Sequence, residues 1–120
     1  MALAVALPAA AAQAQTEIQW WHAMTGANLE RVNSVAEQFN SLQKDYKIVP
    51  SLKGNYDETL AAGIAAFRAG KPPHILQVFD AGTGTMMYSG KAIKPIYEVF
   101  SDAGMKFDPK VYIPAITGYY

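Results

Sequence analysis

The chain contains no cysteine, only two histidines and no excess of either charge. It has 10 Lys and Arg residues against 10 Asp and Glu residues, so its formal net charge is zero. Without cysteine the chain forms no disulfides and offers no thiol for a lipid anchor. Its basic residues are scattered, which argues against a nucleic-acid footprint or a polybasic membrane patch. These absences exclude a disulfide-stapled domain and disfavour nucleic acid as a partner.

The sequence also contains few residues in patterns that are typical of catalytic sites. His22 and His74 are far apart, and neither is surrounded by residues at metal-ligand spacing. The sequence contains no zinc-protease motif, nucleophile elbow or Walker loop. The run Gly82-Thr83-Gly84 lacks the third glycine of a dinucleotide fingerprint, so it is a weak nucleotide motif. We therefore predict no catalytic residue, no metal site and no cofactor.

The first residues form an apolar leader. Residues 1–14 are small and apolar and finish with Ala12-Gln13-Ala14, which is typical of a signal peptide and its cleavage site. The basic n-region is missing, since the first Lys or Arg is Arg31. A spanning helix needs at least about 18 apolar residues. We predict export to the periplasm of an unanchored, soluble product; a disordered Ala-rich leader is the alternative.

The following segments alternate between extended and helical patterns. Apolar extended runs cover 18–21, 48–52 and 75–79, and helices are predicted over 27–42 and after Asn55, where Glu58 completes a capping box. The order is that of an α/β lobe with a parallel sheet. A Gly-rich turn is predicted at 81–85, before short helices at 85–89 and 97–103. The predicted buried faces consist of Leu29, Val32, Ala36 and Phe39 in the first helix, and Leu60, Ala61, Ile64, Ala65 and Phe67 in the second.

Four residues are candidates for a binding site. In open α/β sheets, ligands bind outside the carboxyl ends of the strands. Tyr56 follows the second extended run, Asp80 ends the third, and Trp21 and His22 end the first, so all four belong to that edge. Tyr56 and Asp80 are candidates for ligand contacts, and Trp21 and His22 for a wall of the ligand cleft. Each also has a structural interpretation: Tyr56 as a surface residue, Asp80 as a helix N-cap, and Trp21 and His22 as a packed aromatic and a histidine holding the next turn.

Several blocks of the sequence together resemble one protein family. They are WWHAMTG, KIVPSLKGNYDETLAAGIAAFRAGKPPHILQVFDAGTGTMM, KAIKPIYEVFSDAG and VYIPAITGYY. They are similar to the periplasmic sn-glycerol-3-phosphate-binding proteins of bacterial ABC importers, which belong to the maltose-binding-like class of extracellular solute-binding proteins. The resemblance covers essentially all of the chain after the leader.

The resemblance implies a fold, a ligand and partners. Residues 15–120 would be an incomplete N-terminal lobe of a two-lobe binding protein, with the C-terminal lobe absent. The protein would be a monomer that captures glycerol 3-phosphate or a glycerophosphodiester, delivers it to an ABC permease in the inner membrane and performs no chemistry. Tyr56 and Asp80 match ligand-contacting positions of the family, although the usual acid at the second position is Glu.

Two other functions remain open at this point. A protein of the same fold could bind a sugar or oligosaccharide, against which Trp21 and Tyr56 would stack. A secreted α/β hydrolase of phosphate esters could instead use Asp80, but it would need a metal cluster or a nucleophile–base pair elsewhere.

Overall fold

The computed structural model describes residues 15–90 and 92–118, so the leader predicted over 1–14 lies outside the described residues. The chain divides into two compact units, the first ending at Asp80 and the second beginning at Ala81. The first unit holds the sheet and its two long helices, and the second contains short helices.

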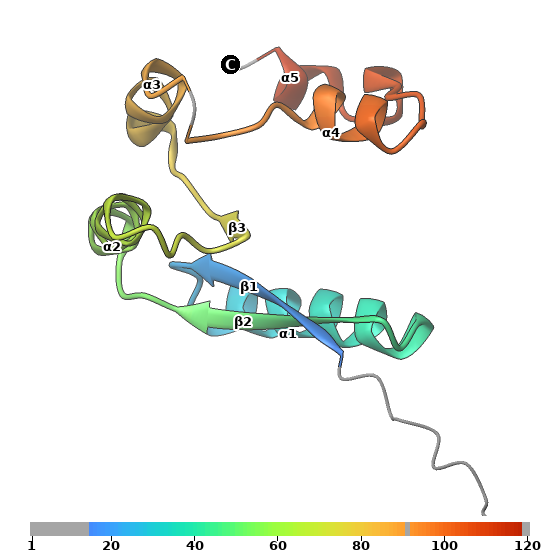
Figure 1. Ribbon diagram of the computed structural model, residues 1–120, viewed down its shortest axis with the longest axis horizontal. Helices are drawn as coiled ribbons and strands as arrows, with labels where there is room; N and C mark the ends of the chain where they lie inside the picture. Colours follow the sequence, from blue (N-terminus) through green and yellow to red (C-terminus); the bar gives the residue numbers. More distant parts are fainter. Residues whose placement is uncertain (1–14, 91, 119–120) are drawn as a thin grey trace, which may run out of the picture. The chain divides into compact units, whose positions relative to one another are not determined.

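A parallel sheet of three strands forms the centre of the first unit (Figure 1). Its strands are β1 (Thr16–His22), β2 (Tyr46–Leu52) and β3 (Ile75–Leu76), in the order β2-β1-β3. β1 and β2 pair along their whole length, from Thr16 opposite Tyr46 to His22 opposite Leu52. The predicted α/β arrangement, with all three extended runs in one parallel sheet, is confirmed.

The third strand is shorter than the predicted run 75–79. Beside it, the backbone hydrogen bonds to β1 are joined by bonds from two side chains. Before β3, the Gln19 N–H donates to His74 Nδ1 (3.0 Å) and the His74 N–H donates back to the Gln19 carbonyl (3.1 Å). After β3, the Gln77 N–H donates to the Trp21 carbonyl, and its side-chain Oε1 accepts from the Ala23 N–H, both at 2.9 Å. These bonds flank β3 on both sides, and the segment leaves strand geometry after Leu76.

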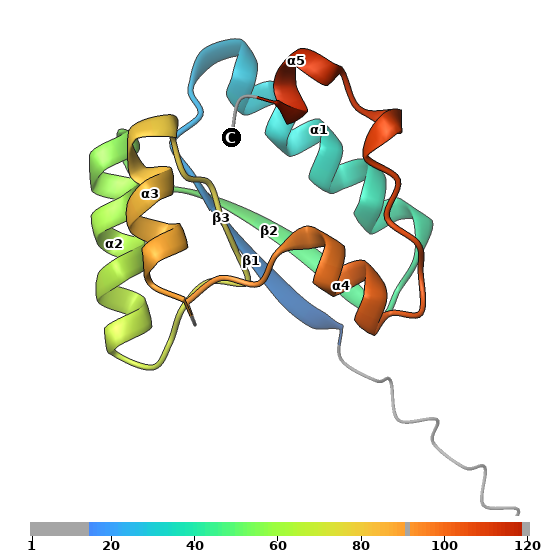
Figure 2. The same cartoon turned by 90° about the horizontal axis from the view of Figure 1, so that it is seen from above.

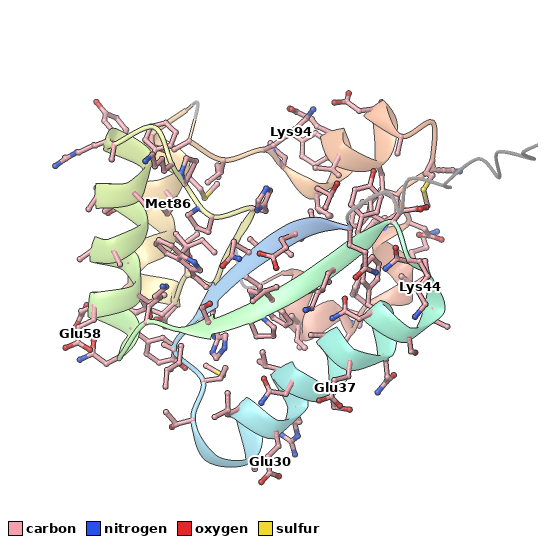
Figure 3. All side chains as sticks on the ribbon, turned by 60° about the horizontal axis from the view of Figure 1, so that its bottom comes forward. Glu30, Glu37, Lys44, Glu58, Met86 and Lys94 are labelled. Atoms are coloured by element: carbon pink, nitrogen blue, oxygen red, sulfur yellow. The ribbon has the colours of Figure 1, made fainter. Side chains whose placement is uncertain are left out.

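Two helices flank the strands, one on each side (Figure 2). α1 (Gly26–Leu42) buries Val32 and Ala36, as predicted. Its Phe39 is 37% exposed, so the predicted burial of that residue is wrong. The face of α1 that packs on the sheet is narrower than the apolar pattern indicated. Asn40, the polar residue next to Phe39, contacts β2 in place of Phe39. Glu30 and Glu37 point away from the sheet (Figure 3).

The second helix, α2 (Tyr56–Arg68), begins with the predicted capping box. The Glu58 N–H donates to Asn55 Oδ1 at 2.9 Å, and the Asn55 N–H donates to Glu58 Oε2 at 2.8 Å. Gly70 follows the helix with a φ of 71°, in the left-handed region that favours glycine at this position. Both ends of the helix therefore agree with the sequence prediction.

The face that α2 turns inward differs from the prediction. Its buried residues are Thr59 and Gly63, whereas Leu60 and Ile64 are half-buried and Ala61, Ala65 and Phe67 are exposed. A Cβ atom on Gly63 would lie 2.5 Å from Leu76 Cδ2. Because no side chain separates the backbone at Gly63 from Leu76, the helix lies close against the sheet. Small residues set this contact, and apolar periodicity does not detect them.

The second unit consists of short helices. α3 (Asp80–Tyr88) starts at the last residue of the first unit and is followed by α4 (Ile96–Asp102), the 3₁₀ turn η1 (Pro109–Val111) and α5 (Pro114–Thr117). The predicted Gly-rich turn at 81–85 is wrong, since this stretch is helical. An aspartate in the first turn, at Asp80, favours a helix that starts there. Phe107 packs edge-to-face against Phe100 and at a tilt against Tyr112, with ring centroids 5.4 and 5.9 Å apart.

The close contact at Gly63 gives a first prediction. We expect Gly63→Ala to lower the free energy of unfolding, because overpacking costs about 1–3 kcal/mol and outweighs the gain in helix propensity of about 1 kcal/mol. Urea unfolding followed by circular dichroism measures the change. Gly84 in α3 is the matched control, since a Cβ there meets no atom within 4 Å. Gly84→Ala should stabilise; equal stabilisation by both changes would contradict the packing argument.

Candidate functional site

A hollow of about 390 Å³ opens at the carboxyl ends of β1 and β2. One side is formed by the chain leaving β1 and the start of α1, and the other by the chain leaving β2 and the start of α2. The lining residues are Ala23, Met24, Thr25, Asn28, Leu52, Gly54, Asn55 and Tyr56. The hollow therefore lies at the edge of the sheet where α/β proteins bind ligands.

His22 holds the chain around this hollow in place. Its side chain is 1% exposed, and its Nδ1 accepts a hydrogen bond from the Met24 N–H at 3.2 Å. Its carbonyl accepts from the Lys53 N–H at 2.9 Å and from the Thr59 hydroxyl at 3.4 Å. The structural interpretation, a histidine that holds the following turn, is confirmed. His22 is not among the lining residues, so its role as a cleft wall stays a prediction.

Trp21 points to the opposite face of the sheet from His22, because neighbouring side chains of a strand alternate. Its ring is half-buried and lies under the Lys53 ammonium, with Nζ 4.2 Å from the ring centroid. This is a cation–π contact at the carboxyl end of the sheet. Trp21 does not line the hollow either, and its role as a wall also stays a prediction.

Tyr56 lines the hollow and connects it to the segment that carries Asp80. It is the first residue of α2 and is 46% exposed. Its ring stacks on Phe79, with centroids 5.5 Å apart and planes at 21°. Phe79 precedes Asp80, which is exposed and is the first residue of α3. The stack thus brings Tyr56 beside the residue next to Asp80, as expected for two groups at one edge.

Sequence reasoning missed several residues around the hollow. The predicted strand 75–79 includes Phe79, and the sequence patterns predict no ligand-binding role for Met24, Thr25 or Asn28. Met24, Thr25 and Asn28 could have been found from their position directly after the first strand, because the loops that leave the strands at this edge meet there.

The hollow carries no charged side chain among its lining residues. At the start of α2, the Asn55 and Glu58 N–H groups are already bonded within the capping box. Asp57 and Glu58 also place two acids in the first turn, and Figure 3 shows Glu58 at this end of the helix. These carboxylates neutralise the positive end of the helix dipole and repel an anion. This edge therefore suits a hydroxyl-bearing group better than an anion.

The described part of the chain offers no group of three or more His, Cys, Asp or Glu residues that could hold a metal ion. Over the same residues, no helix is both long enough and apolar enough to cross a membrane.

The burial of His22 gives a prediction about pH. Desolvation lowers the pKa of His22 below its ordinary value of 6.5. The unfolded chain therefore takes up a proton below pH 6.5 while the folded chain still holds the neutral ring. The free energy of unfolding should fall as the pH drops below this value and be independent of His22 above it. Urea unfolding between about pH 5 and 8 should show this slope, reduced in His22→Gln. Identical slopes in the two proteins would contradict this role of His22.

No protein-family model matches the chain. Curated relatives nevertheless match it closely, and three of them are each named sn-glycerol-3-phosphate-binding periplasmic protein UgpB. The relative from Pectobacterium atrosepticum is 58% identical over 118 residues, or 98% of this chain. The Yersinia pestis relative is 59% identical over 109 residues (91% of the chain), and the Brucella abortus relative is 60% identical over 107 residues (89%).

The matched segment is 26% of the Pectobacterium protein and 25% of the other two, so the chain spans about a quarter of their length. Identity of this degree along nearly the whole chain reflects common descent. Over the segment that it spans, the chain is similar to the corresponding quarter of these periplasmic binding proteins.

Proposed function

We propose that this chain belongs to the solute-binding component of a bacterial ABC importer, which captures sn-glycerol 3-phosphate or a glycerophosphodiester in the periplasm. The observation that carries the proposal is the identity of 58–60% to relatives named for this ligand and location. In this proposal residues 1–14 are a signal peptide and residues 15–120 are part of an N-terminal lobe. The protein acts as a monomer, passes its ligand to a permease and catalyses no reaction.

Tyr56 and Asp80 contact the ligand in this proposal, at its hydroxyl end. The uncharged lining of the hollow and the two acids at the start of α2 support this orientation. The Asp80 carboxylate accepts hydrogen bonds from hydroxyls and repels a phosphate, while the Tyr56 hydroxyl donates. The phosphate is then held by groups outside this segment, and Trp21 and His22 form a wall of the ligand cleft.

A second candidate is binding of a sugar or oligosaccharide by the same fold. The observation in its favour is the exposed Tyr56 ring, which Phe79 supports from one side. A supported aromatic ring is a flat apolar surface suited to the face of a sugar. The two candidates differ in whether the ligand needs a phosphate.

A chimera separates these functions. Residues 15–120 would replace the matching segment of the Pectobacterium relative, and calorimetry would test glycerol 3-phosphate, glycerol, inorganic phosphate and maltose. We expect binding of glycerol 3-phosphate with an affinity near that of the parent, and no heat from the other three. Binding of maltose alone would favour the sugar candidate. Release of phosphate from glycerol 3-phosphate would contradict a purely binding role.

The role of Asp80 gives a sharper prediction in the same chimera. Asp80→Ala should weaken binding of glycerol 3-phosphate by about 1–3 kcal/mol, since it removes a charged hydrogen-bond partner. Asp80→Asn should reduce the affinity less if the carboxylate acts only as a hydrogen-bond acceptor. Asp45→Ala is the control, because this exposed acid lies at the amino end of β2. A marked drop in melting temperature with unchanged affinity would limit Asp80 to stabilising α3.

Tyr56 can be tested by separating its ring from its hydroxyl. Tyr56→Phe keeps the stack on Phe79 and should weaken binding by about 0.5–1.5 kcal/mol, the usual net contribution of a neutral hydrogen bond. Tyr56→Ala should weaken it further, since the ring contact is also lost. Equal affinities of all three proteins by calorimetry would remove Tyr56 from the site.

A further inference from the structure

β2 is an end strand of the sheet in the part of the chain that the structure describes. Alternate residues of a strand turn their N–H and C=O groups to opposite edges. The Asp45 carbonyl accepts from the Thr16 N–H and the Lys53 N–H donates to the His22 carbonyl, so odd-numbered residues face β1. Tyr46, Ile48 and Pro50 therefore face the free edge. Such an edge is a template for pairing with a strand of another chain.

Two amide side chains from the end of α1 occupy this edge. Asn40 Nδ2 donates to the Ile48 carbonyl at 2.9 Å, and Asn40 Oδ1 accepts from the Ile48 N–H at 2.7 Å. Gln43 repeats the arrangement on Tyr46, with both bonds at 2.7 Å. Each amide thus makes the pair of hydrogen bonds that a neighbouring strand would make. At Pro50 the edge has no N–H to offer.

The strand would otherwise be suited to pairing. Tyr46 and Leu52 are 49% and 46% exposed, and Ile48 and Val49 between them are β-branched. Residues of these types favour strands, and an uncovered edge that carries them is an aggregation site. No charged residue other than Lys47 lies within the strand to discourage an incoming chain.

We infer that Asn40 and Gln43, together with Pro50, close the free edge of β2 against pairing with a second copy of this chain. An incoming strand would have to displace two reciprocal amide pairs before it formed its own hydrogen bonds, and at Pro50 it would gain one fewer. The amides also tie α1 to β2, but a purely structural tie would not control the association state.

The test is the double variant Asn40→Ala/Gln43→Ala, with Gln38→Ala as the control. Gln38 lies on the same helix, and its side-chain amide donates to the Ser34 hydroxyl instead of bonding to β2. Light scattering after size exclusion should show concentration-dependent association of the double variant, and a monomer for the control. In dilute solution, hydrogen exchange at the Tyr46 and Ile48 amides should be at least tenfold faster in the double variant.

A rescue distinguishes edge pairing from general misfolding. Adding Tyr46→Lys to the double variant places a charge on the edge and should restore the monomer, because an edge lysine disfavours strand pairing. If the double variant does not fold, Gln43→Ala alone opens the start of the edge and carries the same test. A folded variant that stays monomeric at high concentration would overturn the inference, and so would association that Tyr46→Lys does not reverse.

Discussion

The arrangement of the first unit depends on the carboxyl end of β1. At this point the His22 carbonyl accepts from the Lys53 N–H and from the Thr59 hydroxyl, while the His22 ring accepts from the Met24 N–H. These bonds fix the chain leaving β2, the first turn of α2 and the turn into α1 relative to one another. The hollow lies between these three segments. Its geometry therefore follows from one buried residue that does not line it.

This placement bears on how an anionic ligand could be recognised. The capping box of α2 uses the Glu58 carboxylate to satisfy the Asn55 N–H, and Asp57 and Glu58 place two acids in the first turn, so the helix start disfavours a phosphate. The lining residues add no positive charge. In the proposed function the ligand is therefore divided, with its hydroxyls at this edge and its phosphate on groups contributed by another part of the protein. Such a division makes binding dependent on both parts being present.

Much of the fold could be predicted from the sequence because it depends on local patterns. The three extended runs, the box at Asn55 and the glycine at Gly70 have local signatures, and the edge holding Tyr56 and Asp80 follows from strand order. Two of the failures, the length of β3 and the buried face of α2, involve contacts distant in sequence. Beside the short β3, the side chains of His74 and Gln77 accept from the Gln19 and Ala23 N–H groups, and α2 buries Gly63 because Leu76 lies against it. Neither pairing has a signature in apolar periodicity.

The two ends of β2 show how one strand serves two opposite requirements. Near its start, Tyr46 and Ile48 have their outward backbone groups satisfied by amides of α1, which leaves no bond for a partner. At its other end, Leu52 and Gly54 border the hollow. Pro50 lies between the two regions and can donate to neither. The carboxyl end of α1 covers the free edge of β2, and Asn28, near the amino end of α1, borders the hollow. A shift of α1 along β2 would therefore disturb the edge and the hollow together, so the amide pairs also hold one wall of the hollow in position.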